Sequence, residues 1–161
     1  RTTKYDASFF QAFVSGNYPS LAEAGIYIKY HRQNILKPNF KNLKVHRKLD
    51  PHVGVLKLFP GISVDFISSV LQSKNMKALV LETFGSGNAP ANGQFLQMLK
   101  SAIDNGVIVL NVTQCVSGTV EQGKYETSMA LRKMGVCSGK RRQSVRIRVV
   151  CPAIRGLAVC P

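Results

Sequence analysis

The sequence lacks the features that would mark a membrane, secreted or metal-binding protein. No stretch approaches the roughly eighteen consecutive apolar residues that a membrane-spanning helix needs. The first residues, Arg-Thr-Thr-Lys-Tyr-Asp, resemble neither a signal peptide nor a transit sequence. The four cysteines are scattered, and none forms a C-x-x-C pair or has a histidine at metal-ligand spacing. We therefore expect free buried thiols, no metal ion, no membrane contact and a reducing, cytoplasmic environment.

Acidic residues are also scarce, since eight Asp and Glu face 22 Lys and Arg for a net charge of +14. All eight acids lie in 1–139, whereas 140–161 holds six basic residues and no acid. Such an excess favours nucleic-acid binding, because Lys and Arg neutralise phosphates. The segment 140–161 nevertheless has no aromatic residue on which bases could stack. A basic protein that associates with nucleic acid is therefore an alternative ranked below a small-ligand protein.

From residue 53 onward the apolar pattern predicts strands that alternate with helices. Strand-like runs occur at 53–59, 78–81 and 107–112, and a fourth strand can begin at Val136. Three helical patterns separate these runs. The first is capped by Ser63 and directs Phe66, Ile67, Val70 and Leu71 inward. The second runs from about Phe95 to Ile103 and ends at Asn105-Gly106, and the third runs from about Tyr125 to Met134. This alternation implies parallel strands joined by right-handed crossovers. The expected fold is an α/β three-layer sandwich with about four parallel strands, Rossmann-like or flavodoxin-like.

The residues before this alternation follow a different pattern. Residues 1–24 are expected to be a connector, with one or two helical turns at 19–23. The segments 25–30 and 43–46 alternate like half-buried strands and can pair as a small antiparallel edge. We therefore divide the chain into the connector 1–24, an α/β domain at 25–139 and an atypical basic tail at 140–161.

Three loops that follow predicted strands, 59–62, 84–90 and 113–118, are expected to share one edge of the sheet. Ligands of parallel sheets bind at the carboxyl ends of the strands. The turn Gly85-Ser86-Gly87-Asn88 can offer backbone N–H groups and the Asn88 amide to a small ligand, although a simple tight turn is the alternative. It is not a dinucleotide fingerprint, because the third glycine is absent.

The same edge holds few groups that could catalyse a reaction. Thr113 could act as a nucleophile only beside a base, and no histidine lies near the carboxyl end of a predicted strand. Glu82 lies inside a strand, where a carboxylate must pair with a cation or face the crevice, because burying it alone is costly. A Ser-His-Asp arrangement is therefore not supported by these residues.

Several motifs together resemble a known family. They are Leu58-Phe59-Pro60-Gly61-Ile62, the stretch 79–90 (Leu-Val-Leu-Glu-Thr-Phe-Gly-Ser-Gly-Asn-Ala-Pro) and the stretch 106–115 (Gly-Val-Ile-Val-Leu-Asn-Val-Thr-Gln-Cys). In this order they resemble the C-terminal domain of cytoplasmic (type I) L-asparaginases over about residues 1–139. The resemblance implies an amidohydrolase that converts L-asparagine to aspartate and ammonia without a cofactor. It also implies a homo-oligomer whose catalytic residues lie in an N-terminal domain, which the C-terminal domain closes over.

The resemblance further implies a site that binds asparagine as an effector. Its residues correspond to Asn88, Thr113 and Cys115, with Gly87 beside them, and Glu82 occupies the position of its arginine. A carboxylate cannot hold the carboxylate of an effector as a guanidinium does. A non-catalytic asparagine-binding module is therefore a second alternative. The same fold also carries amidotransferase subunits and lysophospholipase-like proteins, so fold alone does not settle the substrate.

The segment 140–161 departs from this family, which continues there with an acidic, alanine-rich helix. This chain instead has Arg-rich sequence with two Cys-Pro pairs. We hypothesise that the segment is translated out of frame. A helix-like continuation in another frame of the coding DNA is the expected result.

Overall fold

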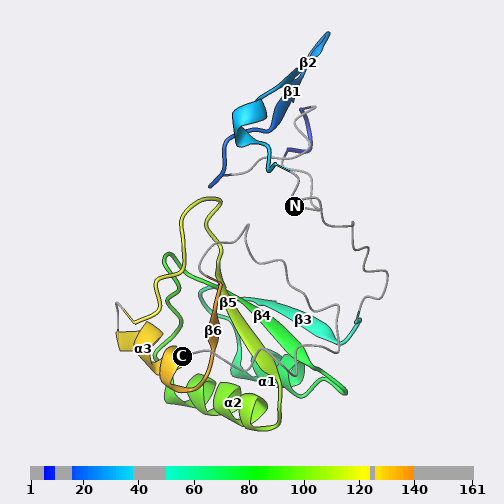
Figure 1. Ribbon diagram of the computed structural model, residues 1–161. Helices are drawn as coiled ribbons and strands as arrows, with labels where there is room; N and C mark the ends of the chain where they lie inside the picture. Colours follow the sequence, from blue (N-terminus) through cyan, green and yellow to red (C-terminus); the bar gives the residue numbers. More distant parts are fainter. Residues whose placement is uncertain (1–5, 10–15, 38–49, 124–125, 140–161) are drawn as a thin grey trace. The chain divides into compact units, whose positions relative to one another are not determined.

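The structure consists of a two-stranded antiparallel sheet and a separate four-stranded parallel sheet (Figure 1). It is a computed structural model that describes residues 6–9, 16–37, 50–123 and 126–139. The chain divides into two compact units, Arg1–His46 and Arg47–Pro161. The predicted strand at 43–46 and the basic tail at 140–161 lie outside the described residues. The predicted boundaries at 24 and 139 stay predictions.

The antiparallel sheet is a hairpin near the N-terminus. A small antiparallel sheet is present as predicted, but the predicted pairing was between the segments 25–30 and 43–46. Strand β1 (Ala22–Ala24) pairs with β2 (Ile28–Tyr30), which places Glu23 opposite Lys29. The helical turns predicted at 19–23 are wrong, because the chain reverses after β1 and the strand backbones bond to each other across the hairpin. The Gly25 amide donates to the Tyr27 carbonyl at 3.2 Å in this reversal.

Polar contacts hold the rest of this unit to the hairpin. A short 3₁₀ helix, η1 (Arg32–Asn34), follows β2. The Asn34 side chain donates to the Ser20 carbonyl at 3.0 Å, and the Tyr18 hydroxyl donates to the Asn34 carbonyl at 2.8 Å. No described residue of Arg1–His46 is fully buried, so hydrogen bonds organise the described part of this unit more than apolar packing does.

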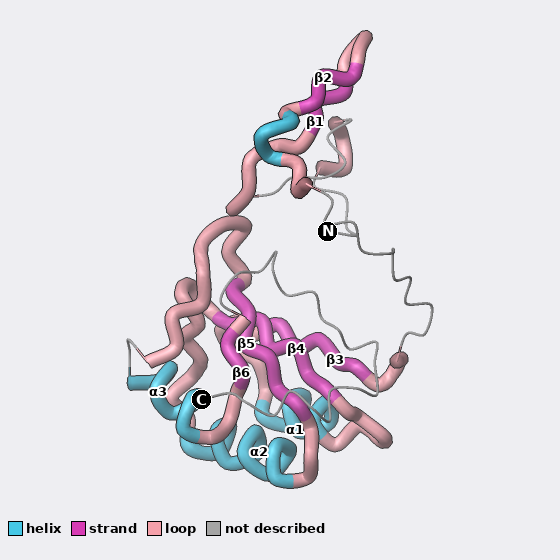
Figure 2. The backbone as a smooth tube through the Cα atoms, viewed as in Figure 1, coloured by secondary structure: helices cyan, strands magenta, loops and turns pink. Residues whose placement is uncertain are grey.

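The parallel sheet confirms the predicted α/β class and strand number (Figure 2). Its strands are β3 (Val53–Lys57), β4 (Ala78–Thr83), β5 (Ile108–Thr113) and β6 (Cys137–Ser138). They neighbour one another in chain order, and each neighbouring pair is parallel. The central strands β4 and β5 are the longest and lie between partners on both sides, and four of the six residues in each are apolar.

Three helices in the described part of the chain, α1 (Val64–Leu71), α2 (Gly93–Asp104) and α3 (Glu126–Lys133), lie on one side of this sheet (Figure 1). Consecutive strands that are neighbours and joined by crossovers of one hand place every crossover helix on the same face. The described residues therefore form two layers. The third layer of the predicted sandwich would have to come from outside them. None of the described helices combines the length and the apolarity that crossing a membrane requires.

The core lies between the helices and the facing side of the sheet. Its side chains from the sheet and the helices are each at most 3% exposed: Leu56, Leu79, Leu81, Val109, Ile67, Phe95, Leu99 and Leu131. Phe66 was predicted to face this core but is 52% exposed. Its neighbour Ile67 takes the inward direction, at 3% exposed, and adjacent helical residues point about 100° apart, so Phe66 lies on the solvent side of the buried stripe. On the other side of the sheet, Val55 is 65% exposed.

Two of the helix ends follow the predicted signals, the Ser63 cap and the Asn105-Gly106 end of α2, whereas the cap at Asn92 was not predicted. The Ser63 hydroxyl accepts from the Phe66 amide at 3.1 Å and caps α1, and Asn92 caps α2 by accepting from the Gln94 amide at 2.9 Å. After α2, Gly106 adopts a φ of +88° and its amide donates to the Ile103 carbonyl at 2.9 Å. These hydrogen bonds determine where α1 and α2 begin and where α2 ends.

Candidate functional site

The loops after β3, β4 and β5 leave one edge of the sheet, as predicted, because the three strands are parallel. The backbone pairing continues past the strand ends, with the Leu58 amide donating to the Glu82 carbonyl at 3.0 Å. The Gln114 side chain then donates to the carbonyls of both Leu58, at 2.5 Å, and Glu82, at 2.8 Å. One amide group therefore ties together the carboxyl ends of three strands.

The predicted ligand turn projects from the end of β4 and is closed by its own backbone. Phe84 and Asn88 exchange a pair of hydrogen bonds between their amides and carbonyls, both of 2.9 Å. The Gly87 amide also donates to the Phe84 carbonyl, at 3.0 Å. Gly85 and Gly87 adopt left-handed φ values of +48° and +112° to make this reversal. The N–H groups of Gly87 and Asn88, which we expected to face a ligand, are thus directed into the turn.

Three successive carbonyls of the turn, those of residues 85, 86 and 87, each accept a hydrogen bond from outside it. The Thr113 hydroxyl donates to the Gly85 carbonyl at 2.5 Å. The Glu121 amide donates to the Ser86 carbonyl at 2.9 Å, and the Asn111 side chain donates to the Gly87 carbonyl at 3.1 Å. The turn is therefore held both by β5 and by the segment that precedes α3.

Asn111 and Thr83 form a buried polar pair that sequence reasoning missed. Both side chains are 0% exposed, and the Thr83 hydroxyl donates to the Asn111 side-chain oxygen at 2.6 Å. The Thr83 hydroxyl also lies 3.2 Å from the Val112 carbonyl. The signal was present in the sequence, because Asn111 is a polar residue inside a strand that is otherwise apolar.

Two of the predicted site residues, Thr113 and Cys115, lie directly against the turn. Thr113 is 1% exposed, and its hydroxyl also accepts from the Cys115 amide at 3.0 Å. The Cys115 thiol lies 4.0 Å from the Gly85 carbonyl and is exposed. Our expectation of a buried thiol is wrong for Cys115, because the residue follows the end of β5 and leaves the sheet.

The remaining predicted residues divide between the two faces of the sheet. Gly87 is buried and Asn88 half-buried within the turn. Glu82 is in register with Val112, whereas its neighbour Thr83 is in register with Thr113. Because successive side chains of a strand alternate between faces, Glu82 and Thr113 point to opposite sides. The structure therefore brings Gly87, Thr113 and Cys115 to one turn, and Glu82 projects from the other face of the same strand end.

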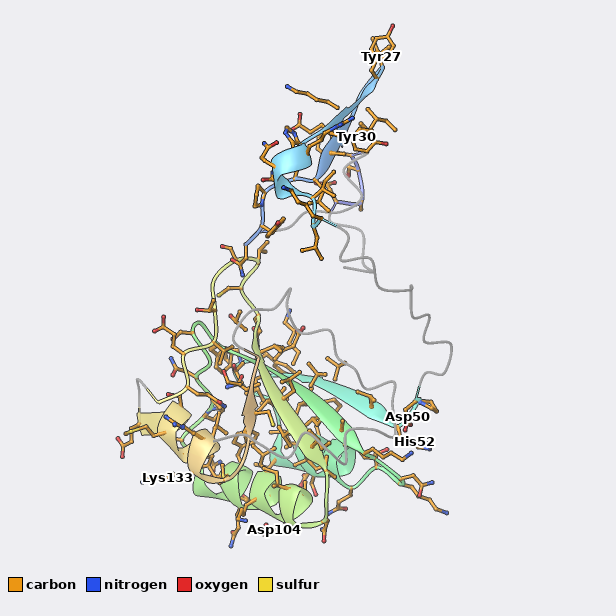
Figure 3. All side chains as sticks on the ribbon, in the orientation of Figure 1. Tyr27, Tyr30, Asp50, His52, Asp104 and Lys133 are labelled. Carbon is orange, nitrogen blue, oxygen red and sulfur yellow. The ribbon has the colours of Figure 1, made fainter. Side chains whose placement is uncertain are left out.

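A charged cluster lies at the amino ends of the parallel strands, before β3 (Figure 3). The Asp50 carboxylate accepts from the Lys77 ammonium at 2.8 Å and contacts the His52 ring nitrogen Nδ1 at 2.8 Å. The Lys77 hydrogen bond, helped by the His52 backbone and side chain, holds the pKa of Asp50 well below its usual range. Within the described ranges, no group of three metal-ligating side chains comes together.

The chain is similar to known proteins over most of its length. Residues 52–151 match the profile of the family described as the glutaminase/asparaginase C-terminal domain. L-asparaginase 1 of Escherichia coli K12 is 44% identical over 139 residues, which are 86% of this chain and 41% of that protein. The 60 kDa lysophospholipase of Mus musculus is 41% identical over 140 residues, or 86% of this chain and 24% of that protein.

A solved structure of an asparaginase is also similar to this chain. L-asparaginase I of Vibrio cholerae superposes with a TM-score of 0.73 at 41% identity, covering 86% of this chain and 42% of that one. The chain thus spans about two fifths of the length of the asparaginases that it matches. The family profile matches well over half of the chain, so this protein belongs to the glutaminase/asparaginase C-terminal domain family.

Proposed function

We propose that this chain is the C-terminal domain of an L-asparaginase and that it binds L-asparagine without hydrolysing it by itself. The observation that carries the proposal is the anchored turn at 85–88, beside Thr113 and Cys115, at the carboxyl edge of a parallel sheet. Ligands bind at this edge in open α/β sheets. The 44% identity to L-asparaginase 1 supports asparagine as the ligand.

Catalysis, in this proposal, belongs to an N-terminal domain of the kind that the matched asparaginases have beyond the length spanned here. An amide-hydrolysing nucleophile needs an adjacent base. The hydroxyl of Thr113 instead donates to a backbone carbonyl and accepts from a backbone amide. The role of this domain is to support and close the catalytic site, and to contribute to contacts between subunits of a homo-oligomer.

The chemistry of the turn suggests which atoms contact the ligand. The amides of Gly87 and Asn88 serve the turn itself, so we assign recognition to the Asn88 side chain and to the exposed Cys115 thiol. Glu82 projects from the other face of the strand, so it supplies no cation with which the turn could hold the carboxylate of a ligand. We therefore expect recognition of the amide end of asparagine, with an affinity below that of a site containing arginine.

Two measurements on the 161-residue chain test this proposal. With L-asparagine, the expected result is no ammonia release above the buffer rate but a rise in unfolding temperature, because a ligand that binds only the folded state stabilises it. The Asn88→Ala variant should lose this rise. Asn105→Ala, at the C-cap of α2, is the matched control and should keep it.

Ammonia release by the chain alone would contradict the assignment of catalysis to another domain. A stabilisation that is the same for L-asparagine, L-glutamine and glycine would contradict specific asparagine binding. A stabilisation that survives in Asn88→Ala would move the binding site away from the turn.

A further inference from the structure

The turn at 85–88 is supported by a buried polar relay that begins on β4. The Thr83 hydroxyl donates to Asn111 Oδ1 at 2.6 Å, and Asn111 Nδ2 donates to the Gly87 carbonyl at 3.1 Å. Thr83 and Asn111 are both 0% exposed. The relay therefore runs from the β4 side chain, through β5, to the backbone of the residue before Asn88.

Asn111 lies in a row of the sheet that is apolar on one side of it and polar on the other. In the strand register it lies between Leu81, which in turn pairs with Leu56, and Ser138 of β6; these leucines are 0% and 2% exposed. Burying an amide there is costly unless its hydrogen bonds are made. A leucine would extend the row without that cost, so packing alone does not account for asparagine at this position.

The Gly87 carbonyl fixes which way the Asn111 amide faces. Because a carbonyl can only accept, the nitrogen Nδ2 faces it, and Oδ1 is left to accept the hydrogen bond from the Thr83 hydroxyl. Gly87 is packed too closely to carry a side chain, since a Cβ there would lie 3.3 Å from Asn111 Nδ2 and 2.7 Å from Val120 Cγ1. The Gly87 carbonyl is therefore held by Asn111 at a position where only glycine fits.

We propose that Asn111 is a positioning residue, which together with Thr83 fixes the turn so that Asn88 is presented to L-asparagine. The ligand part of this inference rests on the function proposed above, whereas the positioning of the turn does not. Asn111 acts through the Gly87 carbonyl and does not touch the ligand. The relay supplies preorganisation, so that binding does not have to order the turn.

Four variants of the full 161-residue chain test the inference. Thr83→Val removes the hydroxyl at nearly constant shape, and Thr83→Ser keeps it. Asn111→Leu matches the leucines of its row. Val109→Ala, at a core position of β5 that is 1% exposed, is the control for general loss of stability.

Two readouts separate positioning from binding. Amide hydrogen exchange of Gly87 and Asn88, which both donate to the Phe84 carbonyl, is measured by NMR without ligand. It is compared with exchange of the Leu99 amide in α2, which reports global opening. The second readout is the dissociation constant for L-asparagine, from an NMR titration.

In Thr83→Val and Asn111→Leu, exchange of Gly87 and Asn88 relative to Leu99 should rise about tenfold, and asparagine binding should weaken about tenfold. Thr83→Ser should stay within about twofold of the parent chain in both readouts. Val109→Ala, which lowers global stability, should not raise the exchange of Gly87 and Asn88 relative to Leu99. If Asn111→Leu does not fold, the Thr83 pair decides.

Unchanged exchange ratios in Thr83→Val would overturn the positioning role whether or not asparagine binds. Altered ratios with undiminished asparagine affinity would overturn the link between the turn and the ligand. If the parent chain does not bind asparagine at all, the proposed function fails, and the exchange ratios still decide the positioning role.

Discussion

At the scale of single residues, Gly87 is restricted both by its own backbone and by its neighbours. Its φ of +112° lies in a region that L side chains rarely adopt, and an added Cβ would lie 2.7 Å from Val120 Cγ1. Gly85 shares the positive φ, at +48°, but a Cβ there would meet nothing within 4 Å. A side chain at Gly85 would therefore meet backbone strain alone, whereas one at Gly87 would meet both strain and steric overlap.

We predict that Gly87→Ala lowers the free energy of unfolding by roughly 2–4 kcal/mol, because strain and overpacking add. Gly85→Ala should lose only about 1–2 kcal/mol, from strain alone. Gly93→Ala, at the start of α2 where a Cβ has open space, is the control and should gain up to about 1 kcal/mol. Urea unfolding measures all three. Equal losses at 85 and 87 would show that contact with Val120 is unimportant.

Asp50 makes the stability of the α/β unit depend on pH. Its pKa is lower in the folded chain than in the unfolded one, so it stabilises the fold above the unfolded pKa of about 4. That stabilisation is lost as the pH falls from there toward the folded pKa. We predict that the difference in unfolding free energy between the parent chain and Asp50→Asn shrinks as the pH falls below about 4.

Lys77 supplies the control for this prediction, because its hydrogen bond is the largest cause of the lowered pKa of Asp50. In Lys77→Met, an NMR titration of the Asp50 carboxyl should give a pKa closer to the ordinary value. An unchanged pKa in this variant would mean that the contacts with His52 alone hold the carboxylate.

At the scale of elements, the buried face of a helix contributes more to the unfolding free energy than the exposed face does. Phe95 on α2 is 1% exposed, whereas Phe66 on α1 is 52% exposed. We predict that Phe95→Ala costs about 3–5 kcal/mol in unfolding free energy, as large-to-small core changes do. Phe66→Ala, the same chemical change on an outward position, should cost less than about 1 kcal/mol. Denaturant unfolding distinguishes them, and similar losses would place Phe66 in the core.

The long periodic elements could be predicted because their own sequences carry the signal. The strand at 78–83 and the helix at 93–104 combine clear apolar patterns with Gly and Asn at their ends. Strand β1 could not, since all three of its residues are exposed and only its cross-strand partners define it. In α1, adjacent Phe66 and Ile67 are both apolar, and the sequence alone does not say which one faces the sheet.

The location of the candidate site could be predicted from the sequence, but its hydrogen bonds could not. Parallel strands bring Thr113 and Cys115 to the Gly85 turn, and the spacing of the strands was enough to expect this. The direction of each hydrogen bond depends on side-chain geometry that no spacing encodes. This is why Asn111 was missed and why the amides of Gly87 and Asn88 were expected to face outward.

At the scale of the whole molecule, the two compact units differ in what holds them together. Every residue of the described core lies in Arg47–Pro161. The described part of Arg1–His46 has no fully buried residue, and Ile26 and Tyr27 at its hairpin reversal are 96% and 86% exposed. Apolar burial, which supplies most of the stability of a fold, is therefore concentrated in the second unit.

We predict that a truncated chain of residues 47–161 unfolds cooperatively, with a free energy within about 1 kcal/mol of the full chain. Circular dichroism during urea unfolding gives both values. Residues 1–46 alone should show no cooperative transition, because none of the described residues of this unit is buried. Loss of cooperative unfolding in the truncated chain would mean that the first unit is needed for the second to fold.

The anchoring of the turn through its carbonyl oxygens has a consequence for how its sequence can change. The oxygens of residues 85 to 87 are held by Thr113, Glu121 and Asn111, and every amino acid carries such an oxygen. These three hydrogen bonds are therefore independent of the side chain at Ser86. That position can be varied while the three bonds stay in place, so the surface of the turn can be altered there without changes to the sheet.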